Sequence, residues 1–170
     1  ENQIPDEPHG RILSKSMDAP AIPLRGGKCC LSFFQERIGF DSYRDIDDLL
    51  EELHAAYDCV LLMGFSAGAT LAWRCGALGH ADGVIACYGS RIRDCTDSEP
   101  LCPVLLLFAV HDSFDVAQLH HTMQQKKLVK SIILPACHSF LDAHHLSCYA
   151  PEQAKQGWQL IDNFIDSLCQ

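Results

Sequence analysis

Four short apolar runs, each followed by a helical pattern, constrain the fold of this chain more than any other feature. The runs do not alternate apolar with polar residues, which is typical of strands in a sheet covered on both faces. They are Cys59–Met63, Val84–Tyr88, Pro103–Val110 and Ser131–Leu134, with Ala21–Leu24 as a weaker fifth run. Strands that alternate with helices favour right-handed βαβ units. We therefore expect an α/β fold with a doubly wound, mostly parallel sheet.

Helical patterns lie between the apolar runs. Ser42, with Asp45 three residues later, has the pattern of a capping box, in which side chains close the start of a helix. A second helix is predicted from just after Ser66 to about Leu78. Further helices are predicted around Val116–Met123, from Pro151 onward, and over Pro8–Met17. No internal repeat or long linker divides the chain, so we expect one domain over residues 1–170.

Charge and hydropathy exclude several classes of partner. The chain has 13 Lys and Arg against 22 Asp and Glu, a net charge of −9 with histidine neutral. Nucleic-acid binding normally needs a basic surface, so no nucleic-acid partner is expected. The longest uncharged apolar-rich run, Cys59–Trp73, is shorter than the roughly 20 residues of a membrane-spanning helix, so no membrane partner is expected. Residues 1–20 hold Asp, Glu, Pro and Lys instead of a signal-like apolar stretch, and the predicted location is the cytoplasm.

The placement of the ten cysteines indicates their role better than their number does. No CxxC pair occurs, so the paired ligand spacing of a zinc site is absent. Several cysteines lie in or beside the predicted strands, where a thiol acts as a small hydrophobe. We therefore expect a reduced cytosolic protein whose cysteines serve mostly as small apolar residues, and no metal site.

The segment Gly64-Phe65-Ser66-Ala67-Gly68 matches Gly-x-Ser-x-Gly between a predicted strand and a helix of small residues. Such a turn strains its central residue, and glycine on both sides is expected to let the backbones pass closely. The Ser66 hydroxyl would stand above the sheet, beside a helix N-terminus that favours negative charge. The alternative is a glycine-rich turn that only packs a helix on a sheet. We interpret Ser66 as a candidate nucleophile because suitable partners follow it.

A serine nucleophile needs a base to take its proton and a third group to orient that base. In an α/β sheet these partners should follow the C-terminal ends of later strands. Asp112 follows one predicted strand, and His138 follows the next. The order serine, acid, histidine is the order of this type of site. We expect Asp112 to orient the imidazole and His138 to act as general base, then general acid.

Other residues compete for these roles. Asp115 is a reserve candidate for the acid, although its position suits a helix N-cap. Cys137 lacks flanking glycines, so it is expected to be a structural thiol rather than a nucleophile. The histidine pair at 120–121 is expected on a helix surface. The pair at 144–145 is expected in a loop, where it could line the mouth of a site or bind a metal adventitiously.

Several ordered motifs point to one family. They are Gly64–Gly68, Cys87–Gly89, Val110–Asp112, Ala136–Phe140, and Tyr149–Pro151 with Trp158 and Phe164 after it. Together they resemble the dienelactone hydrolase family of the α/β-hydrolase superfamily. The resemblance implies cleavage of an ester, lactone or thioester through an acyl-enzyme, without metal or organic cofactor. By match of motif, Ser66, Asp112 and His138 take the triad roles, and the Ala67 N–H forms half of the oxyanion hole.

Three features depart from the founding members of that family. Ser66 stands where they have cysteine, so the chain resembles the serine-bearing relatives. Asp142 stands where they carry an arginine that grips a substrate carboxylate, so an uncharged acyl substrate is expected. The Ser66 motif also comes early in the chain. The strand whose loop donates the second oxyanion N–H is expected before Glu1 or reduced to Asn2–Glu7, so N-terminal strands of the fold could be lacking.

The leading hypothesis is therefore a small serine hydrolase acting on a small-molecule acyl substrate, with assembly into a homo-oligomer left open. Four aromatic residues beside the predicted loops are candidates for substrate contact, with ordinary core packing as an equal alternative: Phe65, Tyr88, Phe114 and Phe140. The alternative function is a hydrolase fold that serves as a binding or interaction module with an impaired triad. An acyltransferase that uses the same acyl-enzyme is a third hypothesis.

Overall fold

One parallel sheet organises the part of the chain that the structure describes. A computed structural model describes residues 39–169. The strands of its sheet are β1 (Leu61–Phe65), β2 (Gly83–Cys87), β3 (Val104–His111) and β4 (Val129–Cys137). They lie in the order β1-β2-β3-β4, and each neighbouring pair is parallel. The predicted parallel sheet is confirmed, although β4 runs past its predicted end through Pro135, which an edge strand tolerates.

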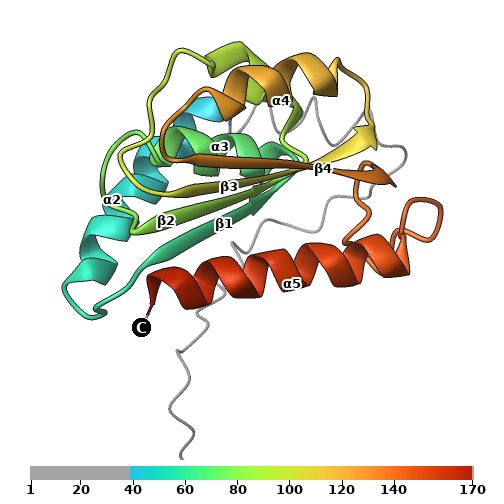
Figure 1. The fold of residues 1–170 in the computed structure, drawn as a ribbon. Coiled ribbons are helices and arrows are strands. Elements are labelled where there is room, and N and C mark those ends of the chain that lie inside the picture. Colours follow the sequence, from blue (N-terminus) through green and yellow to red (C-terminus); the bar gives the residue numbers. More distant parts are fainter. Residues whose placement is uncertain (1–38, 170) are drawn as a thin grey trace, which may run out of the picture.

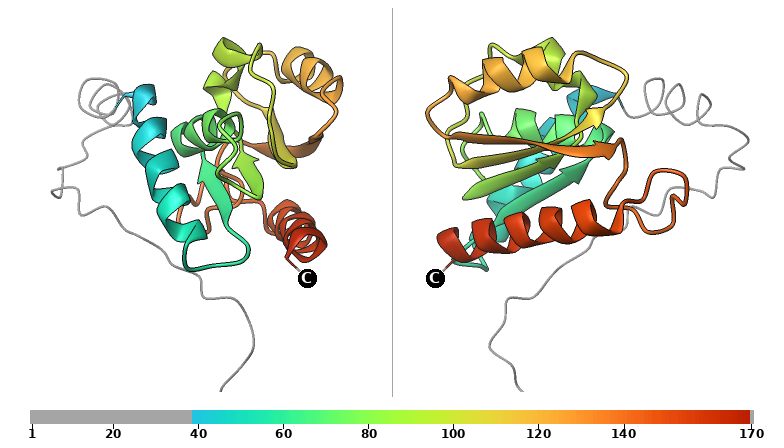
Figure 2. Two further views of the ribbon diagram at one scale, coloured as in Figure 1. Left: turned by 90° about the vertical axis from the view of Figure 1, so that its left-hand side faces the viewer. Right: turned by 45° about the vertical axis from the view of Figure 1, so that its right-hand side comes forward.

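Helices cover both faces of the sheet (Figures 1 and 2). The elements other than strands are η1 (Phe40–Ser42), α2 (Tyr43–His54), α3 (Ala67–Cys75), η2 (Ser90–Cys95), α4 (Val116–Gln124) and α5 (Pro151–Leu168). Helices α3 and α4 pack on one face, with α2 beside α3, and α5 crosses the opposite face. This is the doubly wound arrangement expected from the sequence.

Two apolar layers form the core because successive residues of a strand point to opposite faces of the sheet. The layer toward α3 and α4 includes Val84, Leu106 and Phe108. The layer toward α5 includes Ile85, Leu105 and Leu107. Strands covered in this way must be apolar on both sides, which explains why the runs do not alternate.

The start of α2 corrects one detail of the sequence analysis. A helix does begin at Tyr43, but Ser42 is itself in the right-handed helical region and makes no side-chain cap. Its hydroxyl donates instead to the Gly39 carbonyl, with an O···O distance of 3.0 Å. The capping box is therefore absent because Ser42 ends the preceding turn, η1. The elements predicted over Pro8–Met17 and Ala21–Leu24, and the segment Asn2–Glu7, lie outside the described residues.

A disulfide corrects the expectation that the cysteines are reduced. Cys59, just before β1, is bonded to Cys169, just after α5, with 5.9 Å between the Cα atoms. The buried thiols do act as small hydrophobes: Cys75 and Cys87 lie in the two core layers. Burial raises the pKa of each of these two thiols to about 12, so they stay protonated. The cytoplasmic location remains a prediction.

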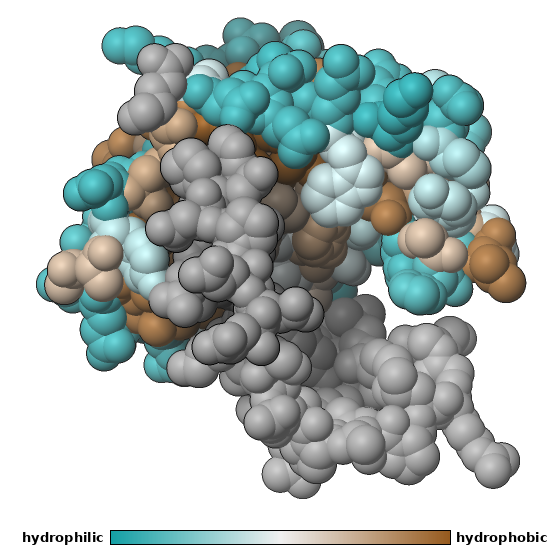
Figure 3. Space-filling view, turned by 90° about the horizontal axis from the view of Figure 1, so that it is seen from below, coloured by the Kyte–Doolittle hydropathy of each residue, from teal (hydrophilic) through white to brown (hydrophobic). Residues whose placement is uncertain are grey.

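Polar residues cover the outer side of α5 in the view from below (Figure 3). Among residues 39–169, no helix has both the length and the apolar character needed to cross a membrane. Over the same residues, no group of three or more His, Cys, Asp and Glu side chains could hold a metal ion.

Candidate active site

Ser66 occupies the sharp turn between β1 and α3. Its backbone has φ 53° and ψ −114°, a left-handed conformation that non-glycine residues rarely adopt. The turn is held by the Ser66 N–H, which donates to the Cys87 carbonyl on β2 at 2.9 Å. The strained geometry predicted for the centre of the motif is therefore present.

The two glycines of the motif are not equivalent. A Cβ on Gly64 would lie within 2.2 Å of the Gly68 carbonyl oxygen, so only glycine fits where β1 passes the start of α3. A Cβ on Gly68 would meet nothing within 4 Å. The expectation that both glycines are required for close approach is thus correct for Gly64 and wrong for Gly68, whose Cβ direction is open.

Asp112 and His138 come together because β3 and β4 end side by side. The register of this strand pair shifts between Ala109 and His111, after which His111 stands opposite Cys137. The His138 N–H donates to the His111 carbonyl at 3.2 Å. Asp112 and His138 are the next residues along the two strands, so the end of this ladder places both side chains at one edge of the sheet.

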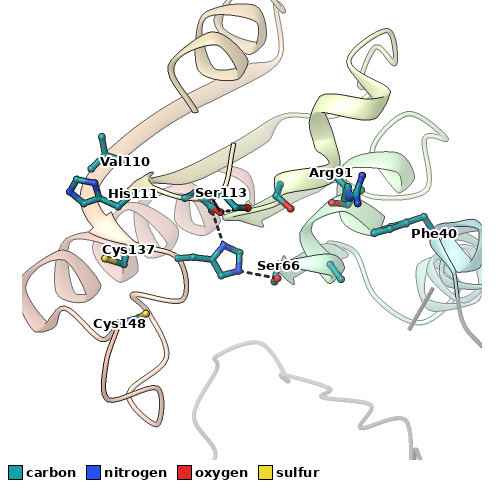
Figure 4. Close-up of a pocket in the computed structure, with 13 residues that line it drawn as sticks. Phe40, Ser66, Arg91, Val110, His111, Ser113, Cys137 and Cys148 are labelled. Carbon is teal, nitrogen blue, oxygen red and sulfur yellow. Dashed lines mark hydrogen bonds and ion pairs between the residues drawn. The ribbon is translucent and has the colours of Figure 1, made fainter. Parts of the chain in front are cut away.

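Two hydrogen bonds connect the three predicted side chains (Figure 4). Nδ1 of His138 lies 2.7 Å from Oδ2 of Asp112, and Nε2 lies 3.0 Å from Oγ of Ser66. With the carboxylate accepting from Nδ1–H, Nε2 is left without a proton and can accept from the serine hydroxyl. The arrangement can therefore withdraw a proton from Ser66 and store the resulting charge on an imidazolium beside a carboxylate.

The environment of Asp112 keeps this carboxylate charged. Its side chain is 4% exposed, against 33% for His138. Burial by itself raises the pKa of Asp112, but hydrogen bonds from His138 and from Ser113 outweigh burial and hold the pKa below its ordinary value. The backbone N–H of Ser113 donates to Oδ1 at 2.6 Å. Asp112 is thus ionised and fixed in position near neutral pH.

The predicted half of the oxyanion hole lies at the start of α3. Ala67 is the first residue of this helix and lines the same pocket as Ser66. The first N–H groups of a helix have no partners within the helix and favour negative charge. An oxyanion formed on a carbonyl attacked by Ser66 would therefore develop next to suitable donors.

The four aromatic candidates lie outside the pocket lining found among the described residues. Tyr88 is buried behind His138, and Phe140 is fully buried against Tyr88. Phe114 packs edge-on against Phe108. Phe65 is 39% exposed, and its ring contacts those of Tyr88 and of Trp158 on α5. These four residues were candidates because they are close in sequence to the site. Their side chains point away from the pocket, toward α5 or into the core.

The structure also gives positions for the residues that compete with the predicted triad for the catalytic roles. Asp115 is the N-cap of α4, where its carboxylate accepts from the Gln118 N–H at 2.9 Å, as predicted. His120 is only partly exposed, because its Nδ1 lies 2.8 Å from the hydroxyl of buried Ser131. The pair at 144–145 lies exposed in the loop before α5. Cys137 is exposed and lines the pocket.

A pocket of about 960 Å³ opens over Ser66. Its described lining is Phe40, Ser66, Ala67, Thr70, Ser90, Arg91, Val110, His111, Asp112, Ser113, Cys137, His138 and Cys148. Two lining residues could have been found from the sequence. Thr70 is four residues after Ser66 and so on the same helix face, and Arg91 follows the C-terminal end of β2.

Comparisons with known proteins agree with this architecture. The model of the dienelactone hydrolase family matches residues 33–168. A stretch of 69 residues is 45% identical to uncharacterized protein YczH of Bacillus subtilis (strain 168) and covers 40% of this chain and 34% of YczH. A predicted CIB-like hydrolase from Thermoplasma acidophilum has a similar structure, with a TM-score of 0.54 and 16% identity over 79% of this chain and 61% of that one. This second likeness shows the fold alone. The chain spans only part of the length of either protein.

Proposed function

The chain belongs to the dienelactone hydrolase family, and on that premise we propose that it is a serine hydrolase that cleaves a carboxylic ester, lactone or thioester. The proposal names Ser66 as nucleophile, His138 as general base and acid, and Asp112 as the group that orients the imidazole. The observation that carries it is the pair of hydrogen bonds at His138: Nδ1–H donates to Asp112 at 2.7 Å, and Nε2 accepts from the Ser66 hydroxyl at 3.0 Å.

The first half-reaction forms an acyl-enzyme. Ser66 Oγ attacks the substrate carbonyl while its proton moves to Nε2 of His138, and the carbonyl oxygen becomes an oxyanion beside the Ala67 N–H. The tetrahedral intermediate then collapses, the bond to the leaving group breaks, and the imidazolium protonates the departing alcohol or thiol. Asp112, ionised and nearly enclosed, stabilises the imidazolium in between.

The second half-reaction repeats these steps with water. Nε2 of His138 takes a proton from a water molecule that attacks the acyl carbon, and the proton then returns to Ser66 as the carboxylic acid leaves. His138 lines the pocket over Ser66 and its side chain is one third exposed, so water can reach the imidazole.

Hydrolysis of para-nitrophenyl acetate by the native chain and by Ser66→Ala tests the proposal. Loss of the nucleophile of a triad removes most of the catalysis, so Ser66→Ala is expected to lower kcat by about 1,000-fold or more. Ser167→Ala removes an exposed serine hydroxyl on α5 outside the described pocket lining, so this control variant is expected to retain most activity. Equal rates for the native chain and Ser66→Ala would favour the alternative of a binding module.

A further inference from the structure

We propose that Phe40 forms the wall that binds the acyl group of the substrate, and that this group is an uncharged, apolar chain. The inference rests on the proposed function, because it assigns the substrate class of the same pocket. Phe40 and Ser66 line one pocket of about 960 Å³, in which Phe40 is half-buried. In Figure 4 the Phe40 side chain points from η1 toward the space over Ser66.

The position of His138 decides which part of an ester faces Phe40. During acylation the imidazolium gives its proton to the leaving group, so the leaving group must lie next to Nε2. The oxyanion lies beside the Ala67 N–H at the start of α3. Figure 4 shows His138 on one side of Ser66 and Phe40 on the other. The acyl chain takes the remaining direction from the reacting carbon, away from His138 and toward Phe40.

One arginine in the last turn of α3 holds η1 in place. Nη1 of Arg74 donates to the Phe40 carbonyl at 2.6 Å and lies 3.3 Å from Oδ1 of Asp41. The guanidinium also lies over the ring of Tyr43, 3.9 Å from its centroid. Since α3 begins directly after Ser66, this helix sets the position of Phe40 relative to the nucleophile. Arg74 is therefore a positioning residue for the acyl wall.

The charges around the pocket favour an uncharged acyl group. Arg91 lies on the same side of the site as Phe40, but its guanidinium already donates to Asp94 at 3.1 Å, so an anionic group would compete with Asp94. The other formally charged residue of the described lining, Asp112, is enclosed within the triad. An apolar chain beside Phe40 removes its ring from water and separates neither pair of charges. Asp142 led to the same expectation of an uncharged substrate from the sequence.

The first test varies the acyl group at a constant leaving group and compares kcat/KM for para-nitrophenyl hexanoate with that for the acetate. Each methylene fully removed from water strengthens binding about fourfold. A ring that covers about two methylenes implies that the hexanoate-to-acetate ratio falls about 10-fold in Phe40→Ala. Phe40→Leu keeps an apolar contact and should retain most of the ratio. Phe164→Ala removes a half-buried ring on α5 outside the described pocket lining, so its ratio is expected to equal that of the native chain.

A second series varies the alcohol, with ethyl acetate and hexyl acetate as substrates. The alcohol lies on the side of His138, so the hexyl-to-ethyl ratio should be the same in the native chain and in Phe40→Ala. A change in this ratio as large as the change in the acyl series would overturn the assignment of Phe40 to the acyl side.

The positioning role of Arg74 is tested with the same ratio. Arg74→Met keeps an unbranched side chain but releases the Phe40 carbonyl, so the hexanoate-to-acetate ratio should fall several-fold. Arg74→Lys keeps a charged donor and is expected to give an intermediate ratio. A purely structural role would lower the rates on both esters equally through loss of folded protein. An unchanged ratio in Arg74→Met would therefore contradict the positioning role.

A binding measurement separates this inference from the proposed function. Ser66→Ala protein, with and without Phe40→Ala, is titrated with N-methylhexanamide and N-methylacetamide, and binding is followed by NMR. A preference for the longer amide that Phe40→Ala abolishes supports the acyl wall even if no ester is hydrolysed, in which case only the serine-hydrolase proposal fails. Hydrolysis that depends on Ser66, with a hexanoate-to-acetate ratio that is unchanged or higher in Phe40→Ala, overturns the acyl wall and leaves the hydrolase standing. Absence of both hydrolysis and amide binding overturns both proposals.

Discussion

The aromatic ring of Tyr88 packs against the imidazole of His138, with centroids 4.9 Å apart and planes inclined by 58°. Tyr88 is 3% exposed and has φ 46°, a conformation unfavourable for a side chain of its size. Its other ring contacts are with Phe65 and Phe140. A strained, enclosed ring directly behind the imidazole can hold it in line with Ser66, so we assign Tyr88 a positioning role.

Tyr88→Ala is expected to lower kcat about 100-fold, because a misplacement of about 1 Å in a catalytic group has that effect. KM should change much less, since Tyr88 does not line the described pocket. Tyr88→Phe keeps the ring and should retain most of the turnover. Steady-state kinetics on para-nitrophenyl acetate, with circular dichroism as a check on folding, measure both variants. Equal losses in Tyr88→Phe and Tyr88→Ala would contradict a role that depends on the ring.

The two glycines beside Ser66 give a second prediction with an internal control. Gly64→Ala forces a methyl group toward the Gly68 carbonyl and should destabilise the fold by about 1–3 kcal/mol, with loss of activity. Gly68→Ala points into open space near the start of α3 and should be neutral or stabilising by up to about 1 kcal/mol. Chemical denaturation compares them, and the reverse order of stabilities would refute the model of the turn.

The contact between His80 and Asp47 predicts a pH-dependent contribution to stability. Nδ1 of His80 lies 2.9 Å from Oδ2 of Asp47 on α2, and this hydrogen bond raises the pKa of His80 above its ordinary value. Because the pKa of His80 is higher in the folded protein than in the unfolded chain, protonation of His80 stabilises the fold. This stabilisation is complete below the pKa of about 6.5 that His80 has in the unfolded chain, and it is lost as the pH rises through the pKa of the folded protein.

The unfolding free energies of the native chain and of His80→Gln should therefore differ more at acidic than at alkaline pH. Denaturant titrations from mildly acidic to mildly alkaline conditions measure this difference. A difference that stays constant, or grows toward alkaline pH, would be inconsistent with a charged His80 in the folded protein.

The disulfide between Cys59 and Cys169 should be a major stabilising element. It joins residues separated by 110 positions and ties the entry of β1 to the end of α5. Reduction, or the pair of changes Cys59→Ala and Cys169→Ala, is expected to cost about 2–5 kcal/mol. Guanidinium unfolding with and without reductant provides the measurement. Peptide mapping of the denatured chain should find Cys59 and Cys169 joined before reduction and free after it, and free thiols at both positions without reductant would show that the bond is absent.

The sheet and the convergence of Ser66, Asp112 and His138 were predictable because both depend on local signals in chain order. Buried runs between helical patterns predict parallel strands, and parallel strands bring the residues after their C-terminal ends to one edge. That rule needs no knowledge of side-chain direction, and the structure places Asp112 and His138 directly after paired residues of β3 and β4.

Features that depend on side-chain direction or on distant contacts escaped the sequence analysis. Phe140 is near His138 in sequence, but Ser139 between them has φ 68°, and the ring turns into the core. The Cys59–Cys169 bond joins the segment before β1 to the residue after α5 across 110 positions, and no local pattern marks such a pair. Arg91 lines the pocket from η2, but a single arginine after a strand forms no motif that marks it as a site residue in the sequence.

The central claim is that the Ser66 hydroxyl is a nucleophile activated by His138. Incubation with a fluorophosphonate probe, followed by mass spectrometry of the intact protein and of its peptides, tests it most directly. One adduct is expected on the native chain, located at Ser66 and absent from both Ser66→Ala and heat-denatured protein. A native chain that stays unlabelled, or one labelled equally in Ser66→Ala, would contradict it.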